Sequence, residues 1–199
     1  MSKATPATIF REHPDPGYPG RTEWNAANSD VTIDFAKLRG GRIVGSGGDK
    51  GLTRLMALRH QRAYVGVPIA PDHLDGAAAA DTILAGLPPS PASLRVNIAG
   101  HGLSGMGGIG QAVINAYLAE TLAIVVAALA ARSQSVGLVM SGGQTGFDEA
   151  GIMAGRALGL PTMVTAPRGW RFRPGDGRDV ADEEAFMARF ALDSGDGGG

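Results

Sequence analysis

The strongest chemical signal in the sequence is a glycine-rich loop, SGGQTG, at residues 141–146, between an apolar run and a helix-like segment. Its glycines let backbone amides turn toward a ligand, and the free amides at the following helix N-terminus favour an anion. The loop therefore predicts a phosphate site, although the glycines would also suit a tight turn without a ligand. The predicted ligand-binding residues are Ser141, Gly142, Gly143, Gln144, Thr145 and Gly146.

Two carboxylates, Asp148 and Glu149, follow this loop on the first helical turn. An acidic side chain there is favourable to the helix dipole for purely structural reasons. Asp148 would alternatively bind a ribose hydroxyl or act as a general acid or base. For Glu149 the structural role is favoured. The loop is neither GxGxxG nor a Walker A motif, which disfavours dinucleotide binding of that type and hydrolysis of nucleoside triphosphates.

Two further glycine-rich loops strengthen the binding hypothesis. The first, GGRIVGSGGDKGLTR, contains Gly47 and Gly48, and Thr53 adds a hydroxyl where the next helix begins. The second follows a strand-like run and begins at Gly100. Loops at the carboxyl ends of parallel strands meet at one edge of the sheet, so all three are expected to border one crevice.

Polar and aromatic residues near the N-terminus, in the stretch RTEWN, form another candidate group. Arg21 would pair with a phosphate, Trp24 would stack on a base or pterin ring, and Asn25 belongs to the same stretch. Alternatively, Trp24 packs in the core and Arg21 pairs with Glu23 or faces solvent. The basic stretch APRGWRFRPGDGR would overhang the same crevice, with Arg168 as its best-placed cation.

Other chemistries lack support in the sequence. The chain has no cysteine, which excludes disulfides and thiolate sites, and its four histidines show no metal-ligand spacing. No metal site is therefore predicted. Neither Ser104 nor Ser141 lies in a GxSxG nucleophile elbow, so a hydrolase triad is not predicted either.

The elements that must position these loops alternate between strands and helices. Strands are expected at 31–35, 63–69, 94–99, 136–140 and 161–166, and helices at 51–61, 75–85, 109–132, 147–158 and 181–192. This pattern predicts a Rossmann-like, doubly wound α/β fold, with a mainly parallel sheet of five or more strands covered by helices on both faces. We expect one domain over residues 1–193 and a disordered glycine-rich tail over 194–199.

Composition limits the partners. The net charge is -1 with both signs interspersed, so neither nucleic acid nor an anionic membrane surface is an expected partner. The apolar stretch 112–131 is nearly long enough to cross a bilayer, but Asn115, Tyr117 and Glu120 interrupt it. We interpret it as a buried or interface helix, which favours a homo-oligomer. The absence of cysteine fits a cytoplasmic location.

Four segments together resemble the SLOG superfamily, most closely its molybdenum-carrier branch, which is related to the YpsA group. They are SGGQTGFDEAG with ALGLPTMVTAPRGWR, the stretch 18–30 around RTEWN, the strand VTIDFA with its glycine-rich sequel, and LRVNIAGHGLS. In that family the GGQTG segment lies near the N-terminus, whereas here it comes last. The chain thus resembles a circular permutant, with the cut between GWRFRPGDGR and the lead into RTEWN, as neighbouring termini would allow.

The resemblance implies a Rossmann-like SLOG fold and a nucleotide or molybdopterin-like ligand. It implies that Gly142, Gly143, Thr145, Gly146 and Asp148 match the family's main loop, with the RTEWN residues near the site. Relatives include enzymes that cleave nucleoside monophosphates at the N-glycosidic bond, but their PGGxGTxxE signature is absent here. We therefore expect a ligand-binding or carrier protein rather than an enzyme. The alternatives are a phosphoribohydrolase-like enzyme using Asp148 or Glu149, and a non-catalytic oligomeric accessory protein.

Overall fold

The computed structural model describes residues 6–39, 42–43, 46, 51–70, 72–89, 92–174 and 177–191. Its strands are β1 (Thr8–Glu12), β2 (Val31–Arg39), β3 (Arg42–Ile43), β4 (Ala63–Ile69), β5 (Ser93–Gly100), β6 (Ser135–Ser141), β7 (Thr162–Ala166), β8 (Arg171–Phe172) and β9 (Val180–Ala181). Its helices are α1 (Tyr18–Asn28), α2 (Leu52–Arg59), α3 (Gly76–Gly86), the 3-10 turn η1 (Leu103–Gly105), α4 (Gln111–Ala131), α5 (Phe147–Ala157) and α6 (Glu183–Ala188).

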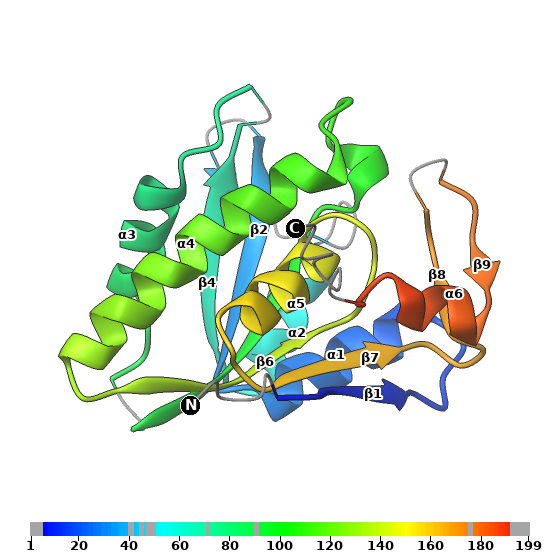
Figure 1. Ribbon diagram of the computed structural model, residues 1–199, viewed down its shortest axis with the longest axis horizontal. Helices are drawn as coiled ribbons and strands as arrows, with labels where there is room; N and C mark the ends of the chain where they lie inside the picture. The colour runs from blue at the N-terminus through cyan, green and yellow to red at the C-terminus, as the bar shows by residue number, and fades with distance from the viewer. Residues whose placement is uncertain are drawn as a thin grey trace, which may run out of the picture.

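Six parallel strands form the central sheet, in the order β1-β7-β6-β5-β2-β4, and β3 pairs antiparallel with the end of β2. Helices α1 and α2 pack together on one face, while α3, α4 and α5 form the layer on the other (Figure 1). The predicted Rossmann-like α/β architecture is confirmed. The five predicted strands and five predicted helices are all present, and the last helix is shorter than expected.

The direction of chain winding reverses beside β2. From β2 the chain passes through α2 to β4 on one side, then returns through α3 to β5 on the other side. Neighbouring strands whose connections leave in opposite directions leave a crevice beyond their carboxyl ends. The carboxyl ends of β2 and β5 are therefore where this fold places a ligand.

Two elements near the N-terminus were not predicted. Strand β1 is a short edge strand that pairs only with β7. Helix α1 begins with Pro19 in its first turn, where proline is tolerated, and it buries Arg21 and Asn25 beside Ala26. Hydrophobic periodicity cannot detect a helix whose buried face is polar.

The hydrophobic core lies mainly between the sheet and the layer of α3, α4 and α5. The Phe35 and Phe147 rings stack with centroids 4.9 Å apart, and Tyr117 meets both rings edge-on. On the other face, among the residues that the structure describes, the buried cluster consists of Ala26, Met56 and Ala57. That face is therefore left with room for polar groups beside α1 and α2.

Helix α4 is long and apolar enough to cross a membrane by length and composition alone. Here it packs between α3 and α5 against the sheet, and 39% of its most apolar window is buried inside the domain. Its buried residues include Leu118, Leu122, Val125 and Leu129. The helix thus contributes to the core of the α/β domain.

Candidate functional site

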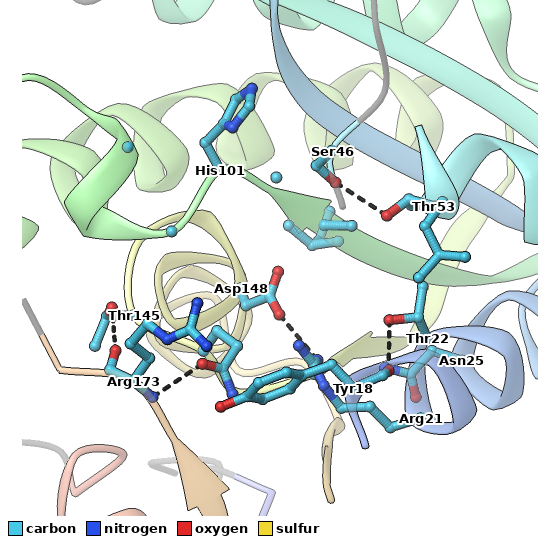
Figure 2. Close-up of a pocket in the computed structure, with 18 of the residues that line it drawn as sticks. Tyr18, Arg21, Thr22, Asn25, Ser46, Thr53, His101, Thr145, Asp148 and Arg173 are labelled. Atoms are coloured by element: carbon cyan, nitrogen blue, oxygen red, sulfur yellow. Dashed lines mark hydrogen bonds and ion pairs between the residues drawn. The ribbon is translucent and has the colours of Figure 1, made fainter. Parts of the chain in front are cut away.

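A cleft of about 540 Å³ opens at the carboxyl edge of the sheet, at the reversal point beside β2. Its walls come from the beginnings of α1, α2 and α5, the end of β5 and the loop after β6 (Figure 2). These segments are far apart in the chain, and the parallel sheet brings them to one edge. The cleft is the position at which α/β proteins of this kind bind ligands.

A buried ion pair lies on the floor of the cleft. The Arg21 Nη1 atom donates to Asp148 Oδ2 at 3.1 Å, and the two side chains are only 8% and 10% exposed. Burial raises the pKa of Asp148 above its usual value, although Arg21 and the backbone amides of Gln144 and Gly100 favour the carboxylate. The pair gives the cleft a fixed cation beside a carboxyl group that holds its proton more tightly than an exposed one.

Gly142 is what allows this pair to form. A Cβ atom at position 142 would lie 0.9 Å from Arg21 Nη1 and 2.8 Å from Asp148 Oδ2. Position 142 must therefore lack a side chain for Arg21 to reach Asp148. The glycine serves an ion pair between residues 127 positions apart, in addition to any role toward a ligand.

Much of the hydrogen-bonding capacity of the predicted loop is directed at the protein itself. The Gly146 amide donates to Gln111 Oε1 at 2.7 Å, and the Ser141 hydroxyl donates to the Ile98 carbonyl at 2.9 Å. The Gln144 amide supports the Asp148 carboxylate. The loop therefore builds the cleft wall as well as facing the cleft.

The side chains of Gln144 and Thr145 attach the β8–β9 hairpin to this wall. The Gln144 Nε2 atom donates to the Arg171 carbonyl at 3.3 Å, and its Oε1 atom accepts from the Arg173 amide at 3.0 Å. The side-chain amide thus pairs with β8 as the backbone of a neighbouring strand would. The Thr145 hydroxyl donates to the Arg173 carbonyl at 2.8 Å. These contacts fix the backbone of Arg173 at the mouth of the cleft.

A polar cluster joins the hairpin to α1 at the mouth. Asp179 accepts from the Tyr18 hydroxyl at 2.8 Å and from Arg173 Nε at 2.9 Å, and Arg171 pairs with its other oxygen. Burial alone would raise the pKa of Asp179, but these hydrogen bonds and guanidinium charges lower it. The Arg173 guanidinium lies 5.5 Å from the Tyr18 ring centroid and remains 47% exposed. Arg173 is thus held in place while its charge stays accessible.

A second polar network lies behind the inner end of the cleft. Asp34, on β2, accepts from the Ser46 amide at 2.8 Å and from the Tyr64 hydroxyl at 3.0 Å. The Ser46 and Thr53 hydroxyls are hydrogen-bonded to each other at 3.0 Å. Burial raises the pKa of Asp34, against the effect of its hydrogen bonds to Ser46 and Tyr64. The network ties the beginning of α2 to β2.

Most of the sequence-predicted site residues come together. Those that line the cleft are Arg21, Asn25, Thr53, Gly100, Gly142, Gln144, Thr145 and Asp148. Gly47 and Gly48 lie outside the described residues. The other predicted residues do not line the cleft; they are Ser141, Gly143, Gly146, Trp24, Arg168 and Glu149.

Several predicted residues have other surroundings. The Trp24 ring lies under the Arg11 guanidinium, 4.0 Å from its centroid. Arg168 is exposed and its amide donates to the Asp15 carbonyl. Glu149 pairs with Arg189 of α6 at 3.3 Å, away from the cleft. Its predicted structural role is therefore what the geometry supports.

The lining residues that the sequence analysis missed include Tyr18, Ser46, Asn97 and Arg173. Tyr18, Arg21, Thr22 and Asn25 follow helical i, i+3, i+4, i+7 spacing, so a prediction of α1 would have placed them on one face. Arg173 belongs to the basic stretch that was expected to overhang the crevice. Ser46 lies in the glycine-rich loop GGRIVGSGGDKGLTR and Asn97 in the segment LRVNIAGHGLS, but neither residue was singled out. Among the residues that the structure describes, no group of side chains is arranged to hold a metal ion.

Comparison with known proteins finds no matching family model, no matching curated protein and no matching solved structure. The assignment of a function therefore depends on the residues and geometry of the cleft.

Proposed function

We propose that the protein binds a phosphorylated, nucleotide-like small molecule in this cleft, as a ligand-binding or carrier protein. The observation that carries the proposal is the presence of Arg21 and Arg173 in a cleft at the reversal point of a doubly wound sheet. Guanidinium groups offer several directed donors to phosphate oxygens. The cleft volume of about 540 Å³ falls in the usual range for small-molecule sites.

The helix N-termini around the cleft support an anionic ligand. Helices α1, α2 and α5 have the N-caps Gly17, Gly51 and Gly146, none of which supplies a side-chain cap. Outside the cleft lining, Asp75 caps α3 and Asp182 caps α6, whereas the N-cap of α4, Gly110, supplies no side-chain cap either. The positive end of a helix dipole at such an N-terminus favours an anion. At α5 the dipole acts without the first amides, because the Gly146 and Phe147 amides already donate to Gln111 Oε1 and to the His101 carbonyl.

Replacing Arg173 with alanine is expected to weaken the binding of a nucleoside monophosphate by roughly tenfold, because a charge-assisted contact is lost. The loss should shrink as salt is raised, since Arg173 is partly exposed. Calorimetric titration with AMP at two salt concentrations measures both effects. Arg168→Ala removes the same charge outside the cleft lining and serves as the control. Equal losses for the two variants would contradict the proposed site.

The proposal includes membership of the SLOG superfamily in circularly permuted form. In one form of the proposal, the bound ligand is a molybdopterin-like cofactor that the protein carries. Contacts between the segment before α1 and the segment after β7 support this permuted order of the motifs. Strand β1 pairs with β7, the His13 amide donates to the Ala166 carbonyl, and the Arg168 amide donates to the Asp15 carbonyl. The segment after β7 thus runs beside the segment before α1, where the family's chain would be continuous.

We also propose a cytoplasmic homo-oligomer assembled through α4. The outward side chains of this helix include Ala112, Val113, Ala116 and Ala127, and Val113 is 54% exposed. Glu120 is exposed on the same helix, and the apolar side chains on either side of it form an outer surface that is typical of a contact between subunits.

A second candidate function is cleavage of a nucleoside monophosphate at its N-glycosidic bond, with Asp148 as general acid. The supporting observation is that Asp148 lines the cleft and that burial raises its pKa. Asp148→Asn should then lower the release of ribose 5-phosphate by about 10²–10⁴-fold while AMP still binds. A wild-type protein that binds AMP and releases no product would exclude this candidate and leave the carrier role.

A further inference from the structure

Helix α1 presents one polar stripe to the cleft. Tyr18, Arg21, Thr22 and Asn25 all line it, at i, i+3, i+4 and i+7. Asn25 lies one helical turn beyond Arg21, or about 6 Å further along the axis. A ligand lying along α1 would therefore meet a cation first and a neutral amide next (Figure 2).

Asn25 has an unused hydrogen-bond acceptor in this position. The residue is 2% exposed, and its Oδ1 atom has no hydrogen-bond partner among the described residues. Leaving a buried carbonyl oxygen without a donor costs free energy. The atom is inaccessible to solvent, so a ligand N–H group that reaches it after a rotation of the Asn25 side chain recovers that free energy.

Apart from Arg21, the cleft residues around Asn25 are uncharged and do not suit a second anionic group. Asn97, Ser46 and Thr53 line the same buried end, at 2%, 3% and 4% exposure. Behind them lies the carboxyl group of Asp34, whose hydrogen-bond donors are the Ser46 amide and the Tyr64 hydroxyl. The polar groups at this end are thus hydroxyls, an amide and a carboxyl group, and the carboxyl group disfavours a second anion beside it.

We infer that Asn25 is a specificity-determining residue, whose Oδ1 atom accepts a hydrogen bond from an amino or ring N–H group on the uncharged head of the ligand. The ligand is then a phosphorylated heterocycle with its anionic end at Arg21 and Arg173 and an N–H-bearing edge at Asn25. This inference rests on the proposed function. An aminopurine nucleotide and an aminopterin-type phosphate share this chemistry.

The test compares phosphates that differ in the donor. AMP carries an exocyclic amino group, purine riboside 5′-monophosphate lacks any N–H on its base, and ribose 5-phosphate has no base. The wild-type protein should bind AMP about tenfold more tightly than purine riboside 5′-monophosphate. Asn25→Leu, close in size but without the acceptor, should reduce this ratio to about one. Competition between AMP and 6-hydroxymethylpterin phosphate identifies which of the two sources is bound more tightly.

Two further variants separate recognition from damage to the fold. Asn25→Asp keeps an acceptor and should keep the preference for AMP. Asn28→Leu makes the same exchange on the same helix at a residue that does not line the cleft and whose side chain donates to the Trp24 carbonyl, and it should also keep the preference. Equal affinities for AMP and purine riboside 5′-monophosphate in the wild type, or an unchanged ratio in Asn25→Leu, would overturn the inference alone. Failure of every phosphate to bind, ribose 5-phosphate included, would overturn the proposed function as well.

Discussion

Replacing Arg21 with methionine is expected to lower the free energy of unfolding by about 3–5 kcal/mol at neutral pH. The variant leaves the Asp148 carboxyl group buried, with its side chain 10% exposed in the wild type and its cation removed. Removing one partner of a buried pair is costly because the other charge stays desolvated. Urea unfolding of both proteins, followed by circular dichroism, measures the difference.

The loss should depend on pH in a defined direction. Burial already raises the pKa of Asp148, and removal of Arg21 raises it further. A carboxyl group with a raised folded-state pKa destabilises the fold increasingly as pH rises through that pKa. Both proteins share the same unfolded-state pKa, so the difference between wild type and Arg21→Met should be smallest below the wild-type pKa of Asp148, grow as pH rises from that pKa to the variant's higher pKa, and reach its full size above it.

The matched control removes both charges. Arg21→Met combined with Asp148→Leu fills the site with apolar side chains and should recover most of the lost stability. A double variant as unstable as Arg21→Met would mean that Arg21 stabilises the protein through packing of its aliphatic stem instead. A loss that does not change between acidic and neutral pH would have the same meaning.

The sheet could be predicted because its strands are buried on both faces. Such strands appear in sequence as short runs rich in β-branched residues, as in β2, β5 and β6. Helix α1 gave no such signal, since its buried side chains include Arg21 and Asn25, which are polar. The stripe of α1 that faces the cleft was therefore visible only as separate residues of the RTEWN stretch.

The location of the site could also be predicted, but the partners of its residues could not. The sequence indicates that Gly142 and Asp148 border a crevice, because they follow a parallel strand. It cannot show that Arg21 occupies the space beside Gly142, since that contact joins distant parts of the chain. In the same way, Gln144 lines the cleft, but the sequence could not show that its side chain also forms hydrogen bonds with the backbone of the β8–β9 hairpin.

Substituting alanine at two adjacent glycines should give different results, because their neighbours differ. At Gly142 the new Cβ would lie 0.9 Å from Arg21 Nη1, at the end of a flexible side chain that can move away from Asp148. At Gly143, where φ is +70°, it would lie 2.6 Å from both Phe186 Cζ and Val164 Cγ1. The first change breaks the ion pair, whereas the second strains the backbone and the packing of α6.

Gly142→Ala should therefore behave like Arg21→Met, with at least tenfold weaker binding of AMP and a stability loss that shrinks at low pH. Gly143→Ala should lose about 1–3 kcal/mol at all pH values, and the folded fraction should still bind AMP within a few-fold of wild type. Calorimetric titration and urea unfolding at pH 5 and pH 8 separate the two. If both variants lose stability equally at the two pH values and bind AMP alike, then Gly142 serves only the turn, and the Arg21–Asp148 pair does not organise the cleft.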